Sequence, residues 1–210
     1  MGPPGSGKGT QVSALKQDMG FESIDTGGML RALSREDSPR ARQVKVIIDS
    51  GRLAPPPLVA RIVTERVVSS VQEGKSVALE GSPRTLHEAE ILLKTLRAEG
   101  IHDILVVFLD VPKPETVQRI LQRWVCEACK RSTMLPVDVP EQCPACGGRL
   151  VKRVDDTLET SHKRWEEYRF RTLPVIQFFQ RQGLVAHVNG HQSIPDVTQE
   201  VHAAVRGQNA

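Results

Sequence analysis

The sequence lacks any long apolar run, because its 39 % of hydrophobic residues are interspersed with 25 % of charged ones. A membrane span needs roughly 20 consecutive apolar residues, and no stretch resembles a span or an export signal. Low-complexity tracts and internal repeats are also missing. We therefore expect a cytoplasmic protein with no membrane partner, whose 210 residues form one sizeable core with small appended lobes.

A strong excess of one charge is also missing. The formal charge of +3 is too small to indicate nucleic-acid binding by itself. The arginines recur singly near the ends of predicted elements and form no block. This distribution favours arginines that bind a small anion.

Near its start the chain carries a phosphate-binding loop, residues 2–10, which read GPPGSGKGT. Glycines at 2, 5, 7 and 9 allow positive φ and let backbone N–H groups turn inward as an anion nest. Val12, Leu15 and Met19 have helical spacing, so a helix N-terminus would also face the phosphates. The commoner loop has a serine or threonine on magnesium where Gly9 stands. The predicted ATP contacts in the loop are Gly5, Ser6, Gly7, Lys8, Gly9 and Thr10.

Alternating strand and helix signals predict an α/β fold, a three-layer sandwich with a parallel sheet covered by helices. Strands are expected at 21–25, 76–80, 104–110 and 184–189. Helices are expected at 11–19, 40–50, 58–73, 86–98, 114–123, 158–182 and 195–206. Two inserts interrupt this pattern, a mostly helical one from Thr26 to about Pro56 and a turn-rich one over 125–154.

All four cysteines lie in the second insert, as the pairs Cys126, Cys129 and Cys143, Cys146. Two such Cys-x-x-Cys pairs separated by 13 residues can place four thiolates around one zinc ion. Four protein ligands leave no open coordination position, which predicts a structural zinc ion. Two disulfides are the alternative, which the missing export signal disfavours.

Taken together, these motifs resemble the adenylate kinase family, in its zinc-containing long-lid form. The resemblance rests on the phosphate loop, Asp25-Thr26-Gly27-Gly28-Met29-Leu30-Arg31, residues 80–85 (EGSPRT), Arg119-x-x-x-Arg123, the cysteines, and Arg153-x-Asp155-Asp156 with Arg164. It implies a core of 1–25, 57–124 and 155–210, a monophosphate-binding lobe at 26–56 and a zinc-binding lid at 125–154. It also implies transfer of the ATP γ-phosphoryl group to AMP by a monomer, with Mg²⁺ and no nucleic-acid partner.

Phosphoryl transfer disperses negative charge, so arginine forks suit it. We predict a catalytic clamp of Lys8, Arg123, Arg153 and Arg164. The resemblance implies further ATP contacts at Arg119, Arg123, Ser132, Thr133 and, by position only, Gln192. The implied AMP contacts are Thr26, Arg31, Arg52, Leu53, Ala54, Gly81, Ser82, Pro83, Arg84, Glu88, Arg153 and Arg164.

Four residues depart from the family pattern. Glu80 stands where the family has an aspartate beside the magnesium water shell, and Gly28 also replaces an aspartate. Ser82 replaces a phenylalanine, and Glu88 replaces a glutamine that reads the adenine edge. A glutamine donates and accepts, whereas a glutamate only accepts. A kinase for UMP, CMP or a deoxynucleotide therefore stays open as an alternative.

Only Met1 precedes the loop, although this family has a buried strand there, between the strands expected at 76–80 and 104–110. We therefore expect the natural protein to begin upstream of Met1. A non-catalytic nucleotide- or RNA-binding zinc ribbon is a further alternative. Trp124 is the only aromatic neighbour of the cysteines, whereas single-strand recognition usually uses several stacking rings.

Overall fold

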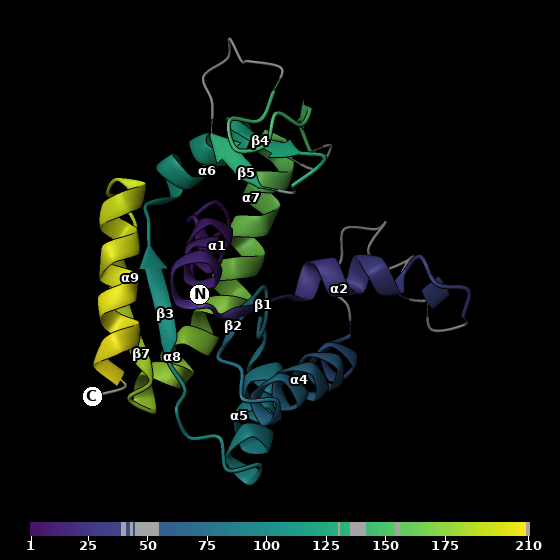
Figure 1. The fold of residues 1–210 in the computed structure, drawn as a ribbon, viewed down its shortest axis with the longest axis vertical. Helices are drawn as coiled ribbons and strands as arrows, with labels where there is room; N and C mark the ends of the chain where they lie inside the picture. Colours follow the sequence, from purple (N-terminus) through teal and green to yellow (C-terminus); the bar gives the residue numbers. More distant parts are fainter. Residues whose placement is uncertain are drawn as a thin grey trace. The chain divides into compact units, whose positions relative to one another are not determined.

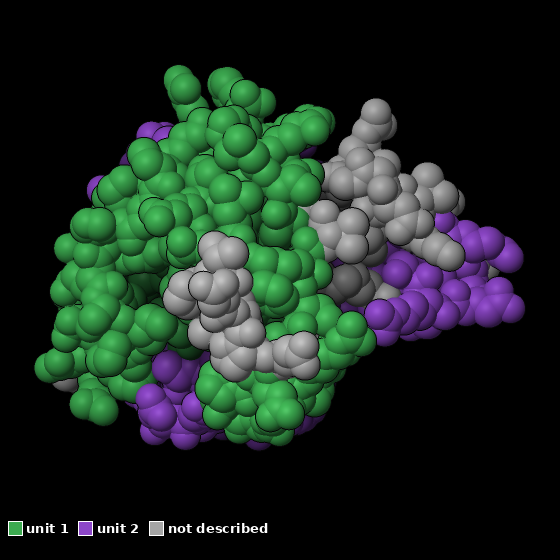
Figure 2. Space-filling view, turned by 90° about the horizontal axis from the view of Figure 1, so that it is seen from above, with its two compact units in different colours: residues 1–11, 107–170, 186–210 green, residues 12–106, 171–185 purple. Residues whose placement is uncertain are grey.

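The computed structural model describes residues 1–38, 41–42, 44, 55–129, 131–134, 142–153 and 156–208, and only the backbone of Arg31 and Gln208. The described chain forms two compact units (Figure 2). Unit 1 consists of residues 1–11, 107–170 and 186–210, and unit 2 of residues 12–106 and 171–185. The helix predicted at 40–50 lies mostly outside the described residues.

The predicted strands all form, each within two residues of its expected bounds. β1 (Glu22–Asp25) and β2 (Val77–Glu80) pair in parallel, with Asp25 opposite Glu80. β3 (Val106–Asp110) pairs with β7 (Val185–Asn189) in a second two-stranded sheet. The chain is therefore an α/β protein with parallel strand pairing, as predicted.

Met1 lies beside β3, where its amino group donates to the Val107 carbonyl and its carbonyl accepts from Leu109 N–H at 2.9 Å. Two bonds that flank one residue of the neighbouring strand are the pattern of a parallel ladder. Met1 thus occupies the position beside β3 that was predicted for a strand before the phosphate loop. Among the described residues, β2 and β3 belong to separate sheets.

Unit 2 is built on the packing of α4 (Pro56–Gln72) against α5 (Leu86–Ala98), which Figure 1 shows. Prolines at the start of α4 suit a helix N-terminus, where their missing N–H groups have no intrahelical partner. Thr85 caps α5 by accepting from Glu88 N–H. Apolar residues from both helices and β1 form the core: Ile24, Val59, Val63, Val67, Leu92 and Leu96.

The helix predicted at 158–182 is confirmed, but it contains a turn that the sequence did not predict. It consists of α7 (Leu158–Glu167), a π-helical turn over Tyr168–Thr172, and α8 (Leu173–Arg181). Pro174 is the physical reason, because it has no N–H for the usual bond to the carbonyl four residues earlier, and a widened turn accommodates that loss. Helical periodicity alone does not reveal such a turn.

The turn-rich insert contains a small sheet that the sequence did not predict. β4 (Arg123–Cys126) pairs antiparallel with β5 (Ser132–Met134) and with β6 (Leu150–Val151). The helix predicted at 114–123 is α6 (Lys113–Leu121), and Arg123 is the first residue of β4. The residues that precede Cys126 therefore serve as a strand, because pairing with two neighbours outweighs their helical spacing.

The remaining helices agree with the prediction apart from their ends. α1 (Lys8–Met19) begins three residues earlier than expected, α2 (Thr26–Leu33) opens the first insert, and α9 (Ile194–Gln208) ends the described chain. None of the described helices combines the length and apolar character needed to cross a lipid bilayer.

Candidate functional site

The phosphate-binding loop curls against β3 and α6 within unit 1. Gly2, Gly5 and Gly7 have positive φ, whereas Gly9 lies in α1, because the helix already begins at Lys8. A Cβ added at Gly5 would lie 2.5 Å from the Thr116 carbonyl oxygen, so only glycine fits this close approach. The predicted turn toward a helix N-terminus is thus confirmed, with three glycines in the special conformation and one in the helix.

Lys8 folds its ammonium over the loop. Its Nζ donates to the carbonyls of Gly2 at 2.9 Å and Pro3 at 2.7 Å, and lies 3.3 Å from Ser6 Oγ. These contacts hold a positive charge directly over the backbone of the loop. Such an arrangement suits an outer phosphate of a nucleotide.

A buried carboxylate joins two of the predicted clamp arginines. Asp156, with 1 % of its side chain exposed, accepts from Arg123 Nε at 2.8 Å and Arg123 Nη2 at 2.5 Å. Arg164 on α7 donates to the same carboxylate at 3.2 Å. A two-pronged bond to one arginine and a single bond to the other fix both guanidinium groups. Arg153 joins this group through its backbone, since its carbonyl accepts from Asp156 N–H at 3.1 Å.

Arg119 contacts the loop that follows β7. Its Nη2 donates to the Gly190 carbonyl at 2.9 Å and to the Glu115 carboxylate, which also contacts His191 Nδ1. Gln192 donates to the Asn189 carbonyl at 3.0 Å and to Glu200 at 2.7 Å. The fold thus brings Arg119 to the loop that carries Gln192, and both residues were predicted as ATP contacts. The spacing of Glu115 and Arg119, four apart on a helix, is a signal that the sequence reasoning missed.

The four cysteines meet in the three-stranded lobe, where their sulfur atoms all lie within 4.8 Å of one another. Cys126 Sγ lies 3.5 Å from Cys146 Sγ, and Cys129 Sγ lies 3.8 Å from Cys143 Sγ. Tetrahedral zinc with Zn–S bonds of about 2.3 Å places its sulfurs about 3.8 Å apart, so the donor set fits zinc. All four cysteines are free thiols, which disfavours the disulfide alternative.

The two thiols of the first cysteine pair ionise unequally. A hydrogen bond from the backbone N–H of Cys129 lowers the pKa of Cys126 to about 7. Although a backbone hydrogen bond from Arg131 acts in the same direction on Cys129, desolvation and the neighbouring thiols raise the pKa of Cys129 to about 11. A Cβ added at Gly148 would lie 2.8 Å from Cys126 Sγ, so this glycine keeps the space beside the sulfurs clear. Cys126, Cys143 and Leu150 form a small buried cluster with Trp124 packed against it, the only core that this lobe has among its described residues.

Within unit 2, the predicted AMP contacts Thr26, Gly81 and Arg84 lie together. A Cβ added at Gly81 would lie 3.5 Å from Arg84 Nη2 and 3.7 Å from Thr26 Cβ. Thr26 Oγ1 is buried and has no hydrogen-bond partner in the part of the chain that the structure describes. Ser82, Pro83 and Glu88 are buried beside them. Arg52, Leu53 and Ala54 lie outside the described residues, as does Asp155.

Gly28 has a structural counterpart in Asp25. A Cβ added at Gly28 would lie 2.6 Å from Asp25 Oδ2. The carboxylate of the residue that precedes α2 thus occupies the space of a side chain at position 28. The negative charge that suits a helix N-terminus comes from Asp25 here.

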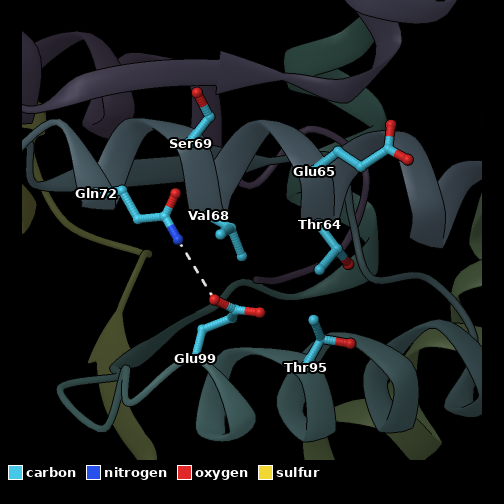
Figure 3. Close-up of a pocket in the computed structure, with 7 residues that line it drawn as sticks. All are labelled: Thr64, Glu65, Val68, Ser69, Gln72, Thr95 and Glu99. Atoms are coloured by element: carbon cyan, nitrogen blue, oxygen red, sulfur yellow. Dashed lines mark hydrogen bonds between the residues drawn. The ribbon is translucent and has the colours of Figure 1, made fainter.

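A groove on the α4–α5 pair of about 330 Å³ offers different chemistry. Its lining, which Figure 3 shows, consists of Thr64, Glu65, Val68, Ser69, Gln72, Thr95 and Glu99. Gln72 Nε2 donates to Glu99 at 3.3 Å. Two carboxylates and no basic side chain line this groove, so it does not suit a phosphate group.

The glycine loop, the lysine over it and the paired arginines define a phosphate-binding-loop protein of the nucleotide kinase class. The family model described as "Adenylate kinase" matches residues 1–184. The adenylate kinase of Carboxydothermus hydrogenoformans is 35 % identical over 209 residues, covering 98 % of this chain and 97 % of the relative. The adenylate kinases of Syntrophotalea carbinolica and Bacillus subtilis are each 36 % identical, covering 98 % and 99 % of this chain and 96 % of each relative. The chain belongs to the adenylate kinase family and is therefore a nucleotide-binding phosphotransferase.

Proposed function

We propose that this protein catalyses the reversible transfer of the γ-phosphoryl group of ATP to AMP, which yields two ADP. The observation that carries the proposal is the arrangement in unit 1, where the Lys8 loop lies in the same compact unit as Arg123 and Arg164, both bound to Asp156. Family membership supports the same reaction, and the relatives' names specify adenylate as their acceptor.

Within this proposal, catalysis is electrostatic. The transition state spreads negative charge over the oxygens of the transferred group, and fixed cations lower its free energy. Lys8, Arg123, Arg153 and Arg164 supply those cations, and Asp156 holds two of them before the substrate arrives. Arg119 and Gln192 are assigned to the ATP base, and Ser132 and Thr133 to ATP contacts from the lid.

The AMP side of the proposal lies mainly in unit 2. Arg84 and Arg31 are assigned to the AMP phosphate, and Thr26, whose buried hydroxyl has no partner among the described residues, to a direct contact. Family membership suggests further contacts at Arg52, Leu53, Ala54, Gly81, Ser82, Pro83, Arg153 and Arg164, while Glu88 faces the loop 82–85. Lobes at 26–56 and 125–154 are proposed to close over the substrates and exclude water.

Two metal ions belong to the proposal. Mg²⁺ arrives with ATP and neutralises phosphate charge. Glu80, at the carboxyl end of β2 and opposite Asp25, would face its water shell. The four cysteines would hold a structural Zn²⁺ that keeps the lid rigid. We also propose that the protein is a cytoplasmic monomer.

The test is ADP formation from Mg-ATP with AMP, UMP, CMP or GMP as acceptor, beside an ATP-only control. We expect turnover with AMP that Lys8→Met lowers by at least about a hundredfold, since a lost transition-state cation typically has such an effect. Lys16→Met, at an exposed position in the last turn of α1, is the matched control and should leave turnover unchanged. Turnover that favours another acceptor would replace AMP, and no ADP with any acceptor would refute the kinase assignment.

A further inference from the structure

Glu88 is a buried carboxylate at the start of α5, with 3 % of its surface exposed. Its Oε2 accepts from the backbone N–H of Arg84 at 2.8 Å and from Ser82 Oγ at 3.2 Å. Its Oε1 accepts from Thr85 Oγ1 at 3.3 Å. Both oxygens therefore point toward the loop 82–85, and all three donors come from that loop.

These bonds act on the backbone that carries Arg84. The backbone N–H of Arg84 is held by Glu88, and its side-chain Nε donates to the Gly81 carbonyl at 2.8 Å. The loop from Gly81 to Thr85 is thus tied at both ends, at the capped start of α5 and at the carboxyl end of β2. Fixing the backbone in this way limits the directions that the Arg84 guanidinium can take.

Two departures from the family pattern are partners in this arrangement. Ser82 stands where the family has a phenylalanine, and Glu88 where it has a glutamine. The Ser82 hydroxyl donates to the Glu88 carboxylate, which a phenylalanine could not do. A glutamate has a second acceptor oxygen where a glutamine has an N–H2 donor, and in this chain the Ser82 and Thr85 hydroxyls donate to the two oxygens.

We propose that Glu88 is a positioning residue for Arg84. Glu88 acts on the phosphate of the bound monophosphate only through the loop 81–85, and it does not read the base. This inference rests on the proposed function, in which Arg84 binds the AMP phosphate. A carboxylate whose two oxygens are engaged by the loop stabilises one loop conformation for every acceptor alike. A base-reading Glu88 would affect acceptors differently.

Two roles for Glu88, positioning Arg84 and reading the base, can be separated by calorimetry. It would measure binding of AMP, UMP, CMP and GMP to the variants Glu88→Ala, Glu88→Gln and Ser82→Ala. Steady-state kinetics would give KM for AMP and ATP. Glu88→Gln keeps an acceptor oxygen for the Arg84 N–H, so we expect a change below about threefold, whereas Glu88→Ala should weaken binding about tenfold. The factor should be equal for every monophosphate that the wild type binds, with KM for ATP unchanged. Glu90→Gln and Glu90→Ala, at an exposed position two residues further along α5, are the matched controls.

Amide hydrogen exchange at Arg84 supplies a readout independent of activity, and Glu88→Ala should speed it while Glu90→Ala should not. A purely structural Glu88 would lower the melting temperature and leave AMP affinity unchanged, which would overturn the inference. A changed order of preference among the four monophosphates in Glu88→Gln would also overturn it. If Glu88→Ala does not fold, Ser82→Ala must weaken binding of all acceptors equally. A wild type that binds no monophosphate would refute the proposed function itself, and this inference with it.

Discussion

The buried carboxylate of Asp156 forms ion pairs with two arginines of the proposed clamp, Arg123 and Arg164. Replacing it with asparagine removes the negative charge between Arg123 and Arg164 and replaces the oxygen that accepts from Arg123 Nε with an N–H2 donor. We expect Asp156→Asn to lower the free energy of unfolding by about 1–3 kcal/mol, because a buried hydrogen-bonded charge is lost. Urea unfolding would measure the change, and ADP formation should fall in parallel.

Glu159→Gln is the matched control for that change, because it breaks an exposed pair with Lys163 on α7, where 77 % and 70 % of the two side chains are exposed. Exposed pairs of this kind contribute little, so its effect should stay within about 0.5 kcal/mol. Equal effects of the two substitutions would show that Asp156 does not anchor the arginines.

Tyr168 offers a second test on a single residue. Burial raises its pKa from 10.0 to about 12, and Trp165 packs edge-on against its ring at 5.3 Å between centroids. It is the only tyrosine in the chain, so absorbance titration of phenolate reports this group alone. We expect the folded protein to titrate near 12, well above a denatured sample.

The same shift sets a direction for stability. Between pH 10 and about 12 the folded state holds a proton that the unfolded state has lost, so stability should fall as pH rises through that window. Below pH 10 the Tyr168 contribution should be constant. Tyr168→Phe should lack this part of the slope, and an identical slope in both proteins would contradict the shift.

At the scale of elements, the small sheet β4, β5 and β6 depends on its cysteine cluster, because few described apolar residues support it. We expect one zinc ion per chain, and Cys129→Ser should abolish it. Gly148→Ala should weaken zinc binding by about tenfold or more, since its Cβ would press on Cys126 Sγ and disturbed support of a ligand commonly has such an effect. A chromogenic chelator competition would measure both.

Gly147→Ala is the control for that substitution. Gly147 has a φ of +71° but nothing within 4 Å of an added Cβ, so it tests backbone strain without contact to the sulfurs. It should lower stability slightly and retain zinc affinity. Equal loss of zinc from both variants would mean that strain, and not contact, governs the site.

At the scale of the whole molecule, the loop proposed to bind ATP lies in unit 1 and Arg84, proposed to bind AMP, lies in unit 2, and each assignment can be tested by ligand-induced stabilisation. A ligand at a hundred times its Kd stabilises the native state by about 2.7 kcal/mol. Lys8→Met should lose the rise in Tm caused by ATP and keep the rise caused by AMP. Arg84→Met should do the reverse, and differential scanning fluorimetry would measure all four combinations.

A loss of both responses in each variant would contradict the separate assignments. Lys16→Met serves again as the control, because it removes an exposed lysine of the same helix as Lys8. Its response to both nucleotides should equal that of the wild type.

The linear sequence by itself determined the features whose parts lie close together along the chain. The phosphate loop and the two cysteine pairs each depend on local spacing, so residue types a few positions apart were sufficient to predict them. The strands β1, β2, β3 and β7 were likewise predicted from the alternation of strand and helix signals along the chain.

Only the tertiary structure decided the pairings between distant residues. Asp156 meets Arg123 across 33 positions, and Arg119 meets the Gly190 carbonyl across 71. It also decided that Arg123 begins a strand, because β4 pairs with both β5 and β6. The physical reason is common to all of them, because hydrogen-bond partners and strand neighbours are set by three-dimensional packing, and local residue preference does not encode which distant donor satisfies a buried acceptor.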